Sequence, residues 1–377
     1  MNKILLLSLG MFALGFDAYI VAGLIPGISE TYNKDISQVG QAVSIFTLFY
    51  AVSAPVFSSI LAGKNIKKVL LYSMLIFTIA NGFTAIAPTF LLLLISRAVA
   101  GIGAGLFSPL AVAASTQFVP PEKRGRALGL TVGGMSIGTV LGVPVGLYIS
   151  ELYDWKITMW TLVVIGIIAI VGMIILLPNI PTVPPPALKE RLKLFLDKRV
   201  TVTVLITFFA GIASLGLYTY LSVLIDDLTI DGHLKVFLWV WGLGGLCGSL
   251  MIGYLIDLFN KPKTLVTVIL VVLTISILCI PFVIHIPFLK YVPFFVWGAV
   301  GWASLAPQQH ILLSYQPKNG SIAIALNSSI NYLGSSIGAM LGGVVIAIGL
   351  GSTSLIYFAA IAMVIAIVFQ LYSVKKL

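Results

Sequence analysis

Long apolar runs separated by short polar segments make up most of this chain of 377 residues. A helix needs ~20 apolar residues to cross the ~30 Å hydrocarbon core of a bilayer. Twelve runs reach about this length, so we expect twelve transmembrane helices and an all-α membrane protein. Their bounds are 4–25, 39–62, 69–87, 90–117, 126–149, 157–177, 201–225, 235–257, 264–284, 288–313, 320–348 and 351–373.

Composition agrees with this pattern. Hydrophobic residues form 59% of the chain and charged residues 9%, whereas soluble domains carry about 25% charged residues. A soluble enzyme or a nucleic-acid-binding protein is therefore excluded. The two cysteines, Cys247 and Cys279, both lie inside apolar runs. We expect neither a disulfide framework nor a zinc site, which needs about four ligands.

The distribution of positive charge predicts an orientation. Of the 22 Lys and Arg residues, 17 fall on one side of the predicted helices, four fall on the other side, and Arg97 falls within a run. Cytoplasmic loops are enriched in Lys and Arg, so we expect both termini to be cytoplasmic. The net charge of +10 then reflects topology and attraction to anionic membrane lipids, and nucleic acid is not an expected partner.

A polar segment divides the chain. Residues 179–199 contain a proline cluster followed by LKERLKLFLDKR, which is typical of an amphipathic helix lying on a membrane surface. We expect a cytoplasmic linker here, an N-terminal six-helix bundle over residues 1–178, and a C-terminal six-helix bundle over residues 200–377.

The two halves also share short glycine patterns. Gly138-Thr-Val-Leu-Gly142 in the fifth run matches Gly338-Ala-Met-Leu-Gly342 in the eleventh, and residues 103–109 match residues 301–307. Glycines spaced by four make a helix face that permits close backbone approach. Parallel six-helix repeats are typical of one class of secondary transporter.

One acid and one base lie deep within the predicted helices. Asp17 stands nine residues before Pro26 at the outer end of the first run, and Arg97 stands eight residues after Thr89 at the outer end of the fourth. At ~1.5 Å per residue, both lie about 12–13 Å below the outer surface. Pairing is therefore expected, either as a static ion pair that fixes helix packing or as a proton-coupling site, since intramembrane ionisable residues are functional by default.

Several catalytic and energy-coupling motifs are absent from the sequence. It contains no G-x-x-x-x-G-K-[ST] phosphate loop, no H-E-x-x-H motif and no G-x-S-x-G motif, which respectively mark nucleotide hydrolysis, zinc-dependent proteolysis and serine hydrolysis. We expect no enzymatic activity, no cofactor and no bound metal.

Motifs in three runs resemble those of a known family. Asp17 and Pro26 are nine residues apart in the first run, and Arg97-Ala-Val-Ala-Gly101-Ile-Gly103 in the fourth has the pattern R-x-x-x-G-x-G. In the fifth run, residues 138–146 are similar to G-x-x-x-G-P-x-x-G-G, with the proline displaced by one position. Together with twelve runs, these motifs resemble the major facilitator superfamily, in particular the bacterial drug:proton antiporters and their sugar- and nucleoside-exporting relatives.

A loop motif of that family, G-x-L-x-D-R-x-G-R-[KR], is unevenly matched. Residues 253–263 after the eighth run keep its core, with Asp257 and Lys261, but Gly63 stands where the aspartate belongs after the second run. The resemblance implies that these elements tune a switch between inward- and outward-facing states. The expected switch residues are Gly138, Gly142, Pro144, Gly146, Asp257 and Lys261.

The resemblance also implies a cavity lined by the first, fourth, seventh and tenth runs. Aromatic rings bind flat or cationic ligands, and Asn327, Asn331 and Ser335 share one helix face in the eleventh run. Lipid contact and interhelical hydrogen bonding remain alternatives for these side chains. The expected substrate-binding residues are Phe16, Tyr19, Gln41, Tyr218, Tyr220, Phe294, Trp297, Trp302, Asn327 and Asn331.

The predicted function is a proton-coupled exporter of small amphipathic molecules that works by alternating access. We expect a multi-pass protein of the bacterial inner membrane, acting as a monomer, with a small-molecule substrate, protons and lipids as partners. Asp17 would carry the proton, and Arg97 would sense its state. A proton-coupled importer or facilitator of sugars or nucleosides, and a membrane receptor that binds without transport, remain alternatives.

Overall fold

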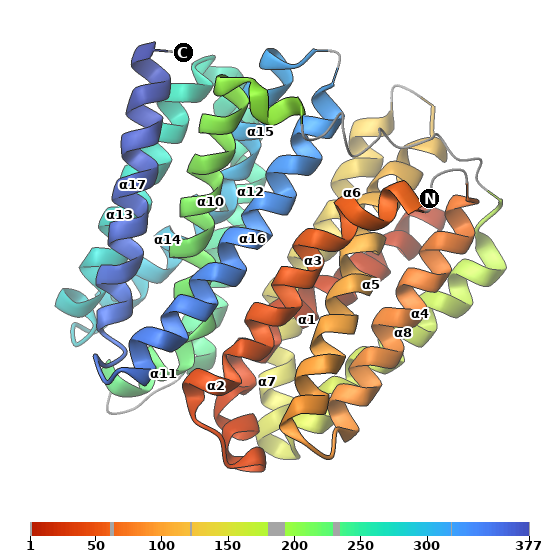
Figure 1. Cartoon of the computed structure of the whole chain (residues 1–377), viewed down its shortest axis with the longest axis horizontal. Helices are drawn as coiled ribbons and strands as arrows, with labels where there is room; N and C mark the ends of the chain where they lie inside the picture. The colour runs from red at the N-terminus through yellow and green to blue at the C-terminus, as the bar shows by residue number, and fades with distance from the viewer. Residues whose placement is uncertain are drawn as a thin grey trace. The chain divides into compact units, whose positions relative to one another are not determined.

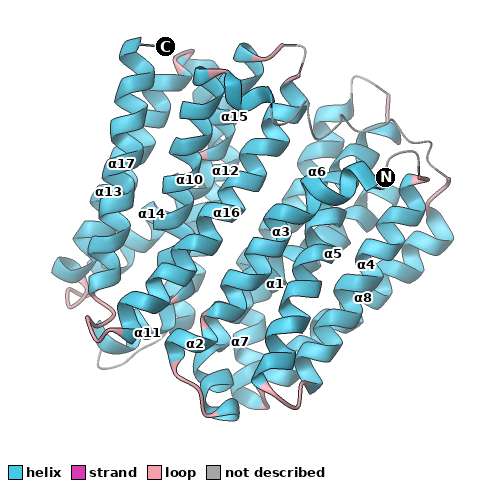
Figure 2. Ribbon diagram, in the orientation of Figure 1, coloured by secondary structure: helices cyan, strands magenta, loops and turns pink. Residues whose placement is uncertain are grey.

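The structure is a computed structural model that describes residues 2–60, 64–120, 123–179, 193–228, 234–317 and 319–376. Regular structure in these ranges is helical (Figure 2). The chain divides into two compact units, Met1–Pro186 and Ala187–Leu377 (Figure 1). The first part of the predicted amphipathic helix, residues 188–192, lies outside the described residues. Its remaining part forms a 3₁₀ turn over Leu194–Leu196 and the start of a helix that begins at Lys198.

The first unit is built from helices that run its full height and from shorter pieces between them (Figure 1). Polar caps mark several starts: the side chains of Asn65, Thr89 and Asp154 accept hydrogen bonds from backbone N–H groups of the helices that follow them. The segments are α1 (Asn2–Tyr32), α2 (Ile36–Val39), α3 (Gln41–Ile60), α4 (Ile66–Ile86), α5 (Phe90–Gln117), α6 (Arg124–Ile137), the π-helical turn η2 (Gly138–Gly142), α7 (Val143–Leu152) and α8 (Trp155–Leu176).

The second unit has the same general build. Its 3₁₀ turns are η3 (Leu194–Leu196) and η4 (Leu289–Tyr291). Its α-helices are α10 (Lys198–Thr219), α11 (Leu221–Leu228), α12 (Leu234–Phe259), α13 (Pro262–Val283), α14 (Val292–Ala303), α15 (Leu305–Tyr315), α16 (Gly320–Ala347) and α17 (Ser354–Lys376).

Within the described residues, eleven helices are long and apolar enough to cross a membrane. None of the eleven covers the predicted run 288–313, because this run forms the two shorter helices α14 and α15 with Ser304 between them. Pro307 has no N–H group to donate to the carbonyl of Ala303, so one backbone hydrogen bond across this break is missing.

The predicted first helix is also longer than expected. Pro26 was expected to end the run, but it lies inside α1, which continues to Tyr32. The helix extends because Tyr32 has partners: its hydroxyl donates to the carbonyl of Ala87 at 2.7 Å, and its ring lies beside that of Trp155.

Glycines bring α1 against α6 and η2 in the first unit. A Cβ atom built on Gly134 would collide with the carbonyl oxygen of Ser8, and one on Gly138 would collide with that of Phe12. A Cβ on Gly142 would lie 2.7 Å from the ring of Phe16. The α1–α6 contact therefore depends on a glycine every fourth residue.

The second unit repeats this packing between α10 and α16. A Cβ on Gly334 would collide with the carbonyl oxygen of Phe208, and one on Gly338 would collide with that of Ile212. A Cβ on Gly342 would lie 2.8 Å from the ring of Tyr220. The glycine repeat seen in the sequence thus corresponds to the same helix contact in each unit.

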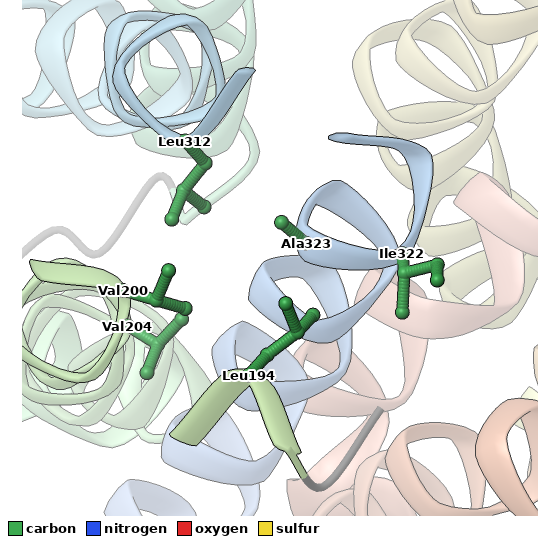
Figure 3. Packing of buried hydrophobic residues seen from close by; sticks show 6 residues of the cluster. All are labelled: Leu194, Val200, Val204, Leu312, Ile322 and Ala323. Atoms are coloured by element: carbon green, nitrogen blue, oxygen red, sulfur yellow. The ribbon is translucent and has the colours of Figure 1, made fainter. Parts of the chain in front are cut away.

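One end of α10 is fixed by an apolar cluster and by a polar cap. The cluster joins η3, α10, α15 and α16, and consists of Leu194, Val200, Val204, Leu312, Ile322 and Ala323 (Figure 3). Beside it, Asp197 caps α10, accepts two hydrogen bonds from the side chain of Arg199, and accepts one from Gln316 at 2.9 Å. These hydrogen bonds hold the pKa of the Asp197 carboxyl below its usual range, and the largest contribution comes from the side chain of Arg199.

Asp197→Ala is expected to lower the stability of the protein by about 0.5–2 kcal/mol at pH 7, which is the usual cost of losing an N-cap. A carboxyl whose pKa is lowered by folding stabilises the folded state above its unfolded pKa of ~3.9, and this contribution is lost as the pH falls through the folded value. Thermal unfolding in detergent at pH 7 and pH 3.5 checks this prediction. An equal difference between variant and wild type at both pH values would contradict it.

Candidate functional site

Asp17 and Arg97 form an ion pair inside the first unit. Arg97 Nη1 in α5 donates to Asp17 Oδ1 in α1 at 2.8 Å. The side chain of Asp17 is 0% exposed and that of Arg97 is 1% exposed. The guanidinium carbon of Arg97 also lies 4.5 Å from the centroid of the Phe46 ring, so a cation–π contact adds to the ion pair.

Asn81 in α4 completes the cluster. Its Oδ1 accepts from Arg97 Nη1 at 3.1 Å, and its Nδ2 donates to the carbonyl of Phe77 at 3.1 Å and, over a longer 3.5 Å, to Asp17 Oδ2. Asn81 is fully buried. The Asp17–Asn81–Arg97 cluster therefore joins α1, α4 and α5 through hydrogen bonds that involve a full charge, which are stronger than neutral ones.

The glycines after Arg97 place its helix. A Cβ on Gly101 would collide with the carbonyl oxygen of Phe46 in α3, and a Cβ on Gly103 would lie 2.7 Å from the backbone nitrogen of Phe77 in α4. Because α5 packs backbone to backbone against α3 and α4, Arg97, one turn before Gly101, comes into contact with Phe46 in α3 and Asn81 in α4. The pattern R-x-x-x-G-x-G thus has a direct packing explanation.

The burial of the cluster has a chemical consequence. Removing one member of a buried ion pair costs about 3–5 kcal/mol, because the other charge is left unpaired. A proton that reaches Asp17 would have the same electrostatic effect on Arg97. The cluster can therefore link protonation to a change in the contact between α1 and α5.

Of the expected substrate residues of the first unit, Phe16 and Tyr19 lie close to Asp17 in sequence and Gln41 does not, and the three differ in surroundings. Phe16 is buried against Gly142 and Gly146, where a Cβ atom would lie 2.6–2.7 Å from its ring. Tyr19 is partly exposed. Gln41 begins α3 and donates to the carbonyl of Ser37 at 3.3 Å.

The expected aromatic residues of the second unit pack on one another. The ring of Tyr218 lies 4.5 Å from that of Trp241, which lies 6.1 Å from Trp297 and 5.8 Å from Trp302. Phe294 lies 6.3 Å from Trp297. The structure thus gathers three of the expected residues around Trp241, which sequence reasoning did not select, and Phe294 joins this group through Trp297.

Two of the expected aromatic side chains also make polar contacts between helices. Trp297 Nε1 donates to Ser214 Oγ at 2.7 Å, and the Tyr220 hydroxyl donates to the carbonyl of Ala339 at 2.8 Å. Both side chains are fully buried. In this conformation they join α14 to α10, and the end of α10 to α16.

The amides of α16 lie in different surroundings. Asn327 is buried, and its Oδ1 accepts from the hydroxyl of Thr207 in α10 at 2.6 Å, while the same hydroxyl also contacts Gln308 Oε1 in α15. Asn327 Nδ2 has no hydrogen-bond partner among the described residues. Asn331, one turn further on, is partly exposed.

The expected switch residues fall in two places. Gly138 and Gly142 bound the π-helical turn η2, which is followed at once by Pro144 and Gly146 in α7. Single π-turns inside helices are frequent at functional sites. By contrast, Asp257 and Lys261 are exposed at the end of α12 and the start of α13, and they form no ion pair with each other.

Sequence reasoning missed Asn81 and Thr207. A signal for Asn81 was present, because it is the one carboxamide in the run 69–87, and an amide within a membrane helix requires a polar partner. Thr207 carried no such signal, since threonine can bond its own helix backbone. Within the described ranges, no three His, Cys, Asp or Glu side chains gather as metal ligands would.

Comparison with known families decides the assignment. A model of the Major Facilitator Superfamily matches residues 7–320, which is more than half of the chain. The chain belongs to this superfamily. It is therefore a multi-pass membrane transporter, and superfamily membership agrees with the glycine packing that is repeated in the two units.

Individual relatives of the superfamily are similar over nearly the whole length. The chain is 27% identical over 372 residues to the uncharacterized MFS-type transporter YbcL of Bacillus subtilis (strain 168), covering 98% of this chain and 95% of that protein. It is 26% identical over 375 residues to the inner membrane transport protein YdhP of Escherichia coli (strain K12), covering 99% and 96%. It is 26% identical over 361 residues to the uncharacterized MFS-type transporter YfhI of Bacillus subtilis (strain 168), covering 94% and 89%.

Proposed function

We propose that this superfamily member is a proton-coupled secondary transporter that exports small amphipathic molecules by alternating access. The observation that carries the proposal is the Asp17–Arg97 ion pair, with a distance of 2.8 Å and side-chain exposures of 0% and 1%. Buried charges of this kind are costly and are functional by default in membrane proteins. Asp17 in α1 and Arg97 in α5 satisfy each other's charge inside the first unit, which favours a role in coupling over a role in binding cargo.

The coupling step follows from electrostatics. With Asp17 ionised, the pair attracts α1 to α5. A proton on Asp17 removes that attraction and weakens the contact, while the glycine face of α6 and η2 gives α1 a smooth surface along which it can shift. One titrating carboxyl corresponds to about one proton per transport cycle.

We also propose a membrane topology for the chain. Helices α14 and α15 together form the tenth of twelve membrane crossings, in two six-helix bundles over residues 1–178 and 200–377, with both termini cytoplasmic. The relative YdhP is an inner membrane protein by name, which supports a bacterial inner membrane location. The proposed working unit is a monomer surrounded by lipid.

Substrate recognition is assigned to aromatic rings and to the amides of α16. Whichever way the Asn327 amide is turned, Thr207 satisfies only one of its ends, so its other end can accept or donate a hydrogen bond. A neutral cargo with hydroxyl or amide groups beside a flat apolar surface fits these side chains. This observation also keeps sugar or nucleoside transport as a second candidate.

Purified protein in proteoliposomes tests the proposal. We expect an imposed pH gradient to drive flux of at least one of four probes: ethidium, chloramphenicol, glucose or uridine. Movement of ethidium or chloramphenicol in the direction opposite to proton flow supports drug-type export. Movement of glucose or uridine in the same direction as protons supports the importer alternative. Probe binding with no pH-driven flux of any of the four would contradict the proposal.

A further inference from the structure

Asn81 offers Arg97 a second acceptor beside the carboxylate of Asp17. The same nitrogen, Arg97 Nη1, donates to Asp17 Oδ1 at 2.8 Å and to Asn81 Oδ1 at 3.1 Å. The orientation of the Asn81 amide is set by its other end, because Nδ2 donates to the carbonyl of Phe77 one turn earlier in α4. The amide oxygen is thus held toward the guanidinium.

The two acceptors respond differently to a proton. When a proton from water binds the Asp17 carboxylate, the carboxyl becomes neutral, while Arg97 keeps its charge and all of its protons. The bond from Arg97 Nη1 to Asp17 Oδ1 weakens, and the bond to Asn81 Oδ1 remains. Arg97 Nε has no hydrogen-bond partner among the described residues, so Asn81 and the face of Phe46 are what then stabilise the buried cation.

Other charged side chains on these helices lie away from the Arg97 guanidinium. On the helices that surround the cluster, the remaining charged residues lie near helix ends: Lys3, Glu30, Lys67, Lys68, Arg124, Arg126, Glu151 and Lys156. The phenols of Tyr19 in α1 and Tyr50 in α3 interact electrostatically with each other. Among the described residues, the polar side chains bonded to Asp17 are those of Arg97 and Asn81.

We propose that Asn81 is a positioning residue that retains Arg97 when Asp17 is protonated, so that the guanidinium passes from carboxylate to amide instead of leaving the site. This inference rests on the proposed function. It explains why a third polar side chain is buried beside the ion pair. It also implies that an acceptor at position 17 and an acceptor at position 81 can partly replace each other as hydrogen-bond partners of Arg97.

The exchange of the two side chains is the test. The variants are Asp17→Asn, Asn81→Leu and the double variant Asp17→Asn/Asn81→Asp, which moves the carboxylate to the other acceptor position. The readouts are pH-driven flux of the probe that the wild type transports, counterflow of the same probe without a gradient, and thermal unfolding in detergent. Asn81→Leu keeps the size of the side chain and removes its oxygen.

The expected results are specific to coupling. Asn81→Leu lowers pH-driven flux about tenfold, which is the equilibrium effect of losing one hydrogen bond to a charge, and displaces the pH at half-maximal flux, while counterflow persists. Asp17→Asn loses pH-driven flux, and the double variant regains part of it.

Two outcomes would overturn the inference. One is an Asn81→Leu protein with the flux and pH profile of the wild type. The other is a double variant that regains the thermal stability of the wild type but none of its pH dependence, since that pattern describes an ion pair that only holds the helices together. If the wild type itself shows no pH-driven flux, the proposed function fails as well, whereas failure of Asn81→Leu alone leaves the role of Asp17 intact.

Discussion

Asp17→Asn is expected to abolish pH-driven flux while leaving counterflow of the same probe measurable. The variant has no group that can alternate between a charge and a proton opposite Arg97, so a pH gradient no longer acts on the α1–α5 contact. Asparagine keeps an oxygen that can accept from Arg97 Nη1, but the guanidinium loses its counter-charge, and stability falls by up to about 3–5 kcal/mol. Counterflow shows that the protein still folds, binds and exchanges its cargo.

A matched control lies on the same helix. Glu30 is exposed near the end of α1, and Glu30→Gln removes one negative charge without touching the ion pair. We expect this variant to transport as the wild type does. Retention of pH-driven flux in Asp17→Asn, with a loss of stability only, would mean that the ion pair is a static support for helix packing.

Gly138→Ala is expected to impair both stability and transport. The added Cβ would collide with the carbonyl oxygen of Phe12, and backbone atoms cannot rotate away as a side chain can. Overpacking of this kind typically costs about 1–3 kcal/mol. Because α1 carries Asp17, the displacement also disturbs the surface along which α1 is proposed to shift, so flux should fall more than stability alone explains.

Gly133→Ala is the natural comparison for that substitution. Gly133 lies in α6, five residues before Gly138, and nothing lies within 4 Å of a Cβ built on it. Alanine is preferred over glycine within a helix by roughly 0.5–1 kcal/mol, so this variant should be as stable as the wild type or slightly more so. Thermal unfolding and flux measured on both variants check the pair, and equal behaviour of the two would show that the α1–η2 contact is not tight.

The ion pair could be anticipated from residue counting, because helical rise converts sequence position into depth. Asp17 and Arg97 lie at similar distances from the outer ends of their runs, and the structure joins them at 2.8 Å. Counting gives depth but not the direction in which a side chain points around its helix. Asn81 was missed for that reason: its bonds to both charges depend on how α4 is rotated about its own axis.

The long apolar runs gave most helices but not their interruptions. The break at Ser304 and the π-turn at Gly138–Gly142 arise from backbone hydrogen bonds that hydrophobicity does not report. Packing partners were equally hidden. Tyr218, Trp297 and Trp302 were selected as single rings facing a substrate, and the structure groups them around Trp241, because aromatic pairing across helices leaves no periodic trace in a single run.

The change in lumenal pH during transport tests the central claim most directly. Proteoliposomes containing pyranine are loaded with the transported probe, diluted into probe-free buffer without a pH gradient, and compared for wild type and Asp17→Asn. If Asp17 couples export to proton uptake, the lumen of wild-type vesicles acidifies as the probe leaves, and the variant gives no pH change. Probe efflux from wild-type vesicles at constant lumenal pH, or the same acidification in the variant, would contradict the account.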